Sequence, residues 1–238
     1  MKPNRMKDKI ARGEPALGCS VMFPSPQIVE MLGCAGFDWV LIDCEHGSIS
    51  ANDVELMAMA CDAAGITPIA RPKTKSPSDI QAVMDRGVMG VQCRTSIPAT
   101  TREAVAAVKF GVGSARGLAA GTRPDAWGMG ARMADFAQAA NAQSLVCVQL
   151  EHEAALANID AILAVEGIDV SSSAPRTSPS RWAIRAIQKP RRSPRRSTSL
   201  GRGSWRPAAR PACPPPPTAL ARWWAMGANT SIPTCPVC

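Results

Sequence analysis

The stretch FDWVLIDCEHG, residues 37–47, joins a continuous apolar run to a cluster of polar residues. Its WVLI run lacks polar alternation, which is typical of a strand buried on both faces by the helices of a parallel α/β fold. Asp43, Glu45 and His46 follow that run directly. Polar residues that follow the strands of such folds converge on the catalytic face. The stretch therefore predicts a parallel sheet with a functional site at the carboxyl end of this strand.

Strand-like and helix-like segments alternate on both sides of this stretch. The expected strands cover residues 17–23, 39–42, 67–70, 88–93 and 145–150, and one more begins at 168. Helices are expected between them, and one follows the fifth strand with Leu156, Ile159 and Leu163 on its apolar face. Such alternation implies parallel strands with right-handed crossovers. A (β/α)₈ TIM barrel and an open doubly wound sheet both fit, although no GxGxxG motif follows the first strand, which weakens a dinucleotide-binding version of the second.

The bulk composition indicates one globular domain. A length of 238 residues fits a single α/β barrel. The six cysteines before residue 170 lie singly in apolar segments without CxxC spacing, so we expect buried thiols in a reducing compartment. No apolar run of signal-peptide length follows the basic N-terminus, and no segment is long enough to span a membrane. We therefore expect a cytoplasmic protein.

Polar side chains recur at the ends of other expected strands. Arg71 follows the third strand, and Gln149 and Glu151 close the fifth. Neighbouring carboxylates can hold Mg²⁺ or Mn²⁺, a His beside an Asp can act as a general base, and the Arg fork suits a substrate carboxylate. Each residue alone also has a structural explanation, such as a helix cap, a loop hydrogen bond or a surface ion pair. Their recurrence at successive strand ends favours a shared site, from which His152 is expected to point away into solvent.

At these residues the chain resembles the HpcH/HpaI aldolase family, which includes 2-dehydro-3-deoxyglucarate and 4-hydroxy-2-oxoheptane-1,7-dioate aldolases. The resemblance runs from about residue 15 to 170. The segments that carry it are FDWVLIDCEHG (37–47), IARP (69–72), MDRG (84–87) with GVQ (90–92), and VQLE (148–151). The D-x-E-H-G segment combined with Q-x-E at this separation is fairly specific, whereas any one segment alone is a weak signal.

The resemblance implies a (β/α)₈ barrel, assembled as a hexamer, that cleaves a small 4-hydroxy-2-oxo acid to pyruvate and an aldehyde. Such reactions belong to aromatic or sugar acid catabolism. The implied mechanism is class II, in which a divalent metal (Mg²⁺, Mn²⁺ or Co²⁺) polarises the 2-oxo group. No Schiff-base lysine is needed, and none lies at a strand end before Asp169.

The resemblance also implies a role for each matching residue. His46 is similar to the family's base, and the negative charges of Asp43 and Asp85 would tune its basicity. Arg71 is similar to the residue that holds the pyruvyl group and offsets charge on the developing enolate. Gln149 is similar to a substrate contact.

The chain departs from the family after Asp169. Glu151 resembles one of two metal ligands, and the other is an Asp in a segment like F-[FI]-I-G-P-[AT]-D-L-S. Here Asp169 and Val170 are followed by SSSAPRTS, which lacks that Asp. The charge changes at the same point, because residues 1–170 contain 15 Lys+Arg and 19 Asp+Glu whereas the rest contain 12 Lys+Arg and no acid. The tail therefore accounts for the net charge of +8.

A shift of reading frame explains this change. Regrouping the codons by one base allows the segment after Val170 to read FFIGPADLS, with permitted choices of the partly free first base, and the missing Asp then straddles Arg176 and Thr177. Further segments regroup to family-like sequence in the right order. We therefore divide the chain into the N-terminal part of a barrel (1–170), an out-of-frame, basic and disordered segment (171–217), and a remnant of the barrel C-terminus (218–238). We expect such a chain to be poorly stable and close to inactive.

Two other interpretations stay open. Relatives of the citrate lyase β subunit share the barrel but act on acyl-CoA, which would want a basic groove that residues 1–170 do not display. If the tail is genuine, the protein could be a non-enzymatic nucleic-acid-binding protein. The Arg-rich composition of the tail suits phosphate binding, and Trp182 and Trp205 could stack on bases. This interpretation does not explain why the regrouped residues match a barrel, so nucleic acid is not the expected partner.

Overall fold

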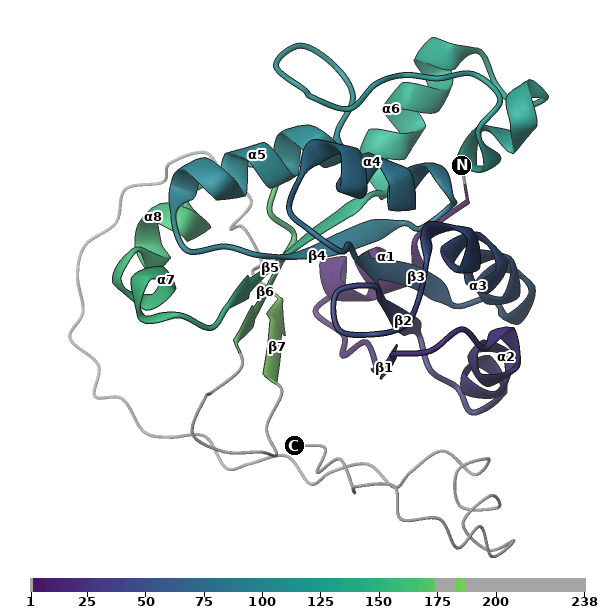
Figure 1. The fold of residues 1–238 in the computed structure, drawn as a ribbon, viewed down its shortest axis with the longest axis horizontal. Coiled ribbons are helices and arrows are strands. Elements are labelled where there is room, and N and C mark those ends of the chain that lie inside the picture. Colours follow the sequence, from purple (N-terminus) through teal and green to yellow (C-terminus); the bar gives the residue numbers. More distant parts are fainter. Residues whose placement is uncertain (1, 174–182, 187–238) are drawn as a thin grey trace, which may run out of the picture.

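Six parallel strands form a curled sheet that is an incomplete barrel (Figure 1). The computed structural model describes residues 2–173 and 183–186. The parallel strands are β1 (Gly18–Val21), β2 (Trp39–Asp43), β3 (Thr67–Arg71), β4 (Gly90–Arg94), β5 (Leu145–Leu150) and β6 (Val170–Ser173). Each strand pairs with the next one along the chain. This order confirms the predicted incomplete (β/α)₈ barrel and excludes the doubly wound sheet, in which the strand order reverses at a switch point.

A seventh strand, β7 (Ala183–Ala186), pairs antiparallel with β6. The sequence after Val170 enters the sheet as well, since Ser171 and Ser172 pair with Val148 and Gln149 of β5. Strand pairing uses backbone groups, which explains why an altered sequence can continue the ladder. The rest of the expected segment 171–217, including the site of the missing Asp, lies outside the described residues, and so does the expected remnant 218–238.

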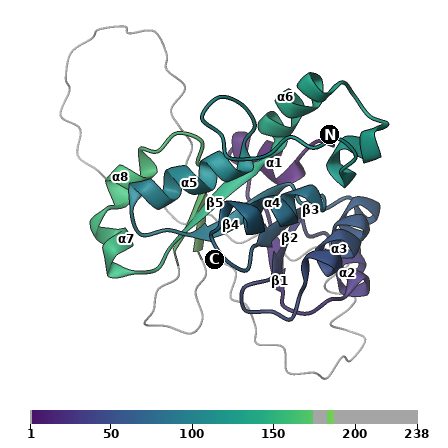
Figure 2. The same ribbon diagram turned by 45° about the horizontal axis from the view of Figure 1, so that its top comes forward.

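Helices lie between the strands and cover the outside of the sheet (Figure 1). They are α1 (Arg5–Ala11), α2 (Pro26–Cys34), α3 (Ala51–Ala64), α4 (Pro77–Asp85), α5 (Pro98–Val108), η1 (Arg123–Gly128), α6 (Met133–Gln143), α7 (Glu153–Ala157) and α8 (Ile159–Leu163). Helices α2 and α3 lie side by side in both views (Figure 2). No helix in the described part of the chain is long and apolar enough to cross a membrane.

Local sequence fixes the start of several helices. Ser25, Ser50 and Ser76 each accept a hydrogen bond from a backbone N–H of the first turn of α2, α3 and α4. The single helix predicted after β5 is wrong in one respect, because it breaks into α7 and α8 at Asn158. The Asn158 side chain donates to the carbonyl of Ala154 at 2.7 Å, which offers the backbone an alternative to continuing the helix.

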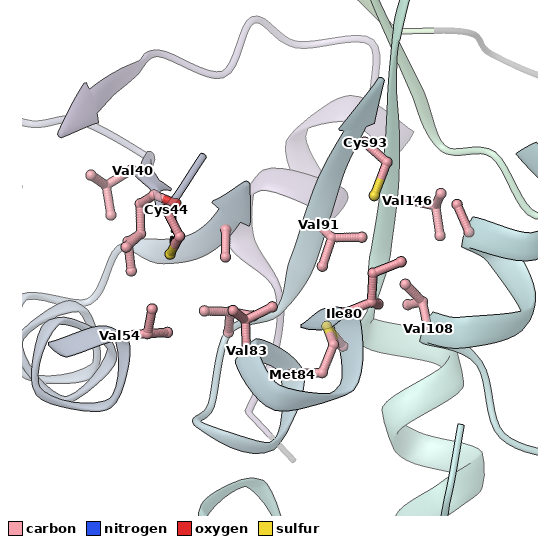
Figure 3. Packing of buried hydrophobic residues seen from close by; sticks show 14 of the residues in the cluster. Val40, Cys44, Val54, Ile80, Val83, Met84, Val91, Cys93, Val108 and Val146 are labelled. Atoms are coloured by element: carbon pink, nitrogen blue, oxygen red, sulfur yellow. Dashed lines mark hydrogen bonds between the residues drawn. The ribbon is translucent and has the colours of Figure 1, made fainter. Parts of the chain in front are cut away.

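Alternate residues of each strand face two different cores. Val40, Val91 and Val146 face outward and pack against Ile80, Val83 and other helix residues (Figure 3). The inward-facing residues form a second cluster inside the half-barrel, which contains Trp39, Leu41, Ile69, Leu145, Cys147 and Val170. Both faces of the sheet are therefore apolar, as the uninterrupted WVLI run predicted.

Helix α1 closes the amino end of the half-barrel, and the sequence pattern did not predict it. Its Met6 joins the inner cluster of strand residues, next to Trp39 and Leu145. Asn4 caps the helix by accepting from the N–H of Lys7, and its side-chain amide donates to the carbonyls of Met89 and Gln143. Basic residues dominate this segment, so its one buried apolar side chain gives no periodic signal.

Candidate active site

Strand register brings four polar side chains into one layer at the carboxyl end of the sheet. Asp43 lies opposite Arg71 in the β2–β3 pair, and Arg94 lies opposite Gln149 in the β4–β5 pair. Each occupies the alternate position that continues the inner cluster along its strand. The sheet therefore brings together three residues that the sequence selected, Asp43, Arg71 and Gln149, and adds Arg94.

Arg71 is the more enclosed of the two arginines of this layer, with 6% of its surface exposed. Its Nη1 donates to Asp43 Oδ2 at 3.2 Å, and its Nη2 donates to Gln149 Oε1. Its Nε lies 3.0 Å from Glu45 Oε2, as an ion pair without the angle of a hydrogen bond. An unpaired buried guanidinium would be costly, so these partners fix both the charge and the orientation of Arg71.

A second arginine joins two carboxylates. Arg94 Nη1 donates to Glu151 Oε1 at 3.2 Å, and Arg94 Nη2 donates to Glu45 Oε1. The other oxygen of Glu151 accepts from Gln149 Nε2 at 2.9 Å. Glu45 thus contacts both arginines, and both oxygens of Glu151 have donors from the protein.

The turn after β2 places His46 beside this network. Asp43 Oδ1 accepts from the backbone N–H groups of Glu45 at 3.0 Å and of His46 at 3.1 Å, which is how an Asp side chain typically fixes a turn. Gly47 follows in a crowded position, where a Cβ atom would lie 2.2 Å from the Asp43 carbonyl. His46 Nε2 lies 3.9 Å from Glu45 Oε2, and its side chain is 53% exposed. The imidazole is therefore open to solvent at the edge of the network.

A pocket of about 370 Å³ opens over the arginines. Its lining is Glu45, Arg71, Pro72, Lys73, Thr74, Lys75, Gln92, Cys93, Arg94, Ser96 and His152. Four cationic side chains against one carboxylate favour a small anionic ligand. His152 is exposed to solvent as expected, but it also lines the pocket with its Nε2 4.0 Å from Glu151 Oε1, whereas the sequence predicted that it points away.

Asp85 lies elsewhere in the described structure. It is the last residue of α4, a helix that runs back toward the amino ends of the strands after β3. Its carboxylate accepts from Arg116 Nη2 at 3.2 Å and from Gln81 Nε2 at 3.3 Å. Within one chain these contacts hold Asp85 away from His46, which it was expected to tune.

The pocket contains one thiol, and this thiol is unreactive. Burial and, secondarily, the negative charge of Glu45 raise the pKa of Cys93 to about 12. Only a thiolate is an effective nucleophile, so Cys93 stays protonated and inert near neutral pH.

The sequence of the chain matches those of known proteins. Residues 18–174 match the family model described as HpcH/HpaI aldolase/citrate lyase. The chain belongs to this family. A hydroxypyruvate/pyruvate aldolase from Sagittula stellata is 30% identical over 167 residues, which cover 70% of this chain and 65% of that protein. A 5-keto-4-deoxy-D-glucarate aldolase from Escherichia coli is 29% identical over 168 residues, with 70% and 64% covered.

Solved structures of the family have a similar fold. An HpcH/HpaI aldolase/citrate lyase family protein from Burkholderia cenocepacia superposes with a TM-score of 0.67 at 29% identity, covering 71% of this chain and 68% of that one. An HpcH/HpaI aldolase from Desulfitobacterium hafniense gives the same TM-score at 26% identity, covering 72% and 66%. The chain matches just under two thirds of the length of its curated relatives.

The described residues do not provide a complete site for the divalent metal that the family implies. Among them, no group of three His, Cys, Asp or Glu side chains is placed to hold an ion. Glu151 and Glu45 are the two carboxylates beside the pocket, and Arg94 bonds to both. The second expected ligand would follow Val170, where this sequence has no Asp. In this structure both carboxylates are therefore paired with the Arg94 guanidinium.

Sequence reasoning missed Arg94 as a site residue and gave Glu45 no role. Both were findable, because Glu45 lies in the DCEHG segment and Arg94 ends a strand just as Arg71 does. The expected fourth strand ended at Cys93, one residue short of the strand end, so the position of Arg94 in the layer went unrecognised. A strand that is ended one residue too early leaves its last side chain without an assigned face.

Proposed function

We propose that the site belongs to a carbon–carbon lyase of the aldolase type, which cleaves a 4-hydroxy-2-oxo acid to pyruvate and an aldehyde. The observation that carries this proposal is the buried guanidinium of Arg71, held by Asp43, Glu45 and Gln149 on a pocket with a positively charged lining. Such a fixed cation suits a 2-oxo acid carboxylate and the negative charge that develops when the bond breaks.

We assign the proton transfers of the cleavage to His46 and the stabilisation of the developing charge to Arg71. His46 Nε2 takes the proton of the C4 hydroxyl while the C3–C4 bond breaks, and the C4 carbon leaves as an aldehyde. The electron pair of the broken bond forms the C2–C3 enolate of pyruvate, whose charge Arg71 offsets. His46 returns the proton to C3, which gives pyruvate. The half-exposed imidazole beside Glu45 supports this role.

The relatives support the substrate class. One is a hydroxypyruvate/pyruvate aldolase, and the other is a 5-keto-4-deoxy-D-glucarate aldolase. By the same resemblance we propose a hexamer in the cytoplasm. A metal requirement would depend on an Asp that only the regrouped reading frame supplies. We therefore propose that the chain as written is impaired and that its in-frame parent is the active aldolase.

The proposal is tested with two chains, the one printed and a restored chain in which the segment after Val170 follows the regrouped frame. Pyruvate release from 5-keto-4-deoxy-D-glucarate is measured with and without Mn²⁺. We expect the restored chain to release pyruvate in the presence of Mn²⁺ and the printed chain to be nearly inactive. Arg71→Lys in the restored chain keeps the positive charge but loses the bidentate guanidinium group, so the rate of pyruvate release should fall by about 100-fold.

Two outcomes would count against the proposal. A restored chain that binds Mn²⁺ and stays folded but forms no pyruvate would remove the aldolase assignment. Cleavage of an acyl-CoA instead would favour the citrate lyase branch of the family.

A further inference from the structure

A cation already lies between Glu45, which lines the pocket, and Glu151 beside it. Arg94 ends β4 and reaches Glu45 of the β2–α3 turn and Glu151 of the β5–α7 turn. We infer that in the printed chain, which lacks the second Asp ligand, the Arg94 guanidinium occupies the position of a divalent cation between these carboxylates and keeps divalent metal ions from them. This role of Arg94 goes beyond the proposed lyase activity and does not depend on it.

The geometry leaves little capacity for a second cation. One oxygen of Glu151 accepts from Arg94 and the other accepts from Gln149. One oxygen of Glu45 contacts Arg94 and the other lies 3.0 Å from Arg71 Nε. An ion that used these oxygens would compete at each of them with a guanidinium or amide nitrogen. Mg²⁺ and Mn²⁺ prefer such carboxylate oxygens, so the competition is direct.

The charge balance leads to the same conclusion. The network contains three carboxylates, of Asp43, Glu45 and Glu151, and two guanidinium groups, of Arg71 and Arg94. Removing the charge of Arg94 would leave three carboxylates against one cation, in a partly buried setting where charges attract strongly. Arg71 cannot compensate, because Asp43 and Gln149 already hold it and only 7% of its side chain is exposed.

Mn²⁺ affinity, measured by calorimetry and by the electron paramagnetic resonance of free Mn²⁺, tests this inference on the full chain. The printed chain should bind Mn²⁺ weakly at the pocket. Arg94→Gln should bind Mn²⁺ at least about tenfold more tightly, because its two carboxylates lose their resident cation. Arg94→Lys keeps a charge and should gain much less. The double variant Arg94→Gln/Glu151→Gln should lose the gain, which would locate the ion at Glu151.

The matched control is Arg102→Gln, an exposed arginine on α5, which should leave Mn²⁺ affinity unchanged. Equal affinity of Arg94→Gln and the parent chain, with both folded by circular dichroism, would overturn the inference. If Arg94→Gln does not fold, the parent chain still decides, because tight Mn²⁺ binding that Glu151→Gln abolishes would show that Arg94 does not exclude the ion. These readouts need no turnover, so they stand apart from the test for pyruvate release.

Discussion

At the scale of single residues, Asp43 and Gly47 determine the conformation of the turn after β2. The Asp43 carboxylate holds both Arg71 and the turn that carries Glu45 and His46. That turn then passes between two backbone segments at Gly47, where a Cβ atom would lie 2.2 Å from the Asp43 carbonyl and 2.4 Å from the Met22 carbonyl. Both obstacles are backbone atoms, so they cannot rotate away. The glycine of the DCEHG segment is therefore required by packing.

Gly47→Ala should move this turn and cost about 1–3 kcal/mol of unfolding free energy, as expected for overpacking. Urea unfolding measures the loss. Gly117→Ala is the matched control, because its Cβ would meet only the flexible Gln81 side chain, at 3.2 Å from the nearest atom. Equal stability of the Gly47 variant and the parent would show that the turn adapts and that packing does not explain the glycine.

At the scale of elements, the short helix α1 contributes strongly to the stability of the half-barrel. Its seven residues place one apolar side chain, Met6, at the amino end of the half-barrel among inward-facing strand residues. Asn4 and Lys7 add hydrogen bonds to the segment that ends α6, at Gln143 and Ser144. The helix therefore joins distant parts of the sequence, and its loss would uncover the inner cluster.

Met6→Ala should lower the unfolding free energy by about 2–5 kcal/mol, the usual range for removing a buried methionine side chain. Chemical denaturation followed by circular dichroism gives the value. Arg12→Ala, which alters an exposed residue directly after the same helix, should change it by less than about 0.5 kcal/mol. Similar losses for both variants would mean that α1 does not close the barrel specifically.

At the scale of the whole molecule, buried thiols make stability depend on pH. Burial raises the pKa of Cys44, Cys61, Cys93 and Cys147 to about 12. The folded chain keeps these protons above pH 9, whereas the unfolded chain releases them. The stabilisation is complete below about pH 9 and is lost as the pH rises toward 12. Lys109 makes stability rise with pH in the same range, because burial lowers its pKa to about 8. This single lysine offsets only part of the effect of the four thiols.

The unfolding free energy should therefore fall between pH 9 and pH 10, with each thiol contributing about 1.4 kcal/mol per pH unit at most. Cys147→Ala should reduce this slope by about one proton. Cys34→Ala, at an exposed thiol, should leave the slope unchanged. Urea titrations at several pH values give these slopes, and a flat profile for the parent chain would contradict the expected burial of the thiols.

The sequence predicted most of the layer at the carboxyl rim, because an apolar strand ending in polar residues is a local pattern. It could not predict partners. Arg71 pairs with Gln149 across 78 positions, and Arg94 reaches Glu45 across 49. Asp85 matched a motif, yet the reversal of α4 carries it away from His46. The one buried residue of α1 gave no periodic signal, and the position of His152 depends on the turn before α7.

The closure of the barrel by α1 has a practical consequence for handling the protein. Asn4 is fully buried and bonded to Gln143 and Met89. An affinity tag placed ahead of Asn4 would therefore lie at the amino end of the half-barrel, opposite the pocket that Lys73 and His152 line. Immobilising the chain on a sensor chip through its N-terminus would therefore leave that pocket open to injected ions and small acids.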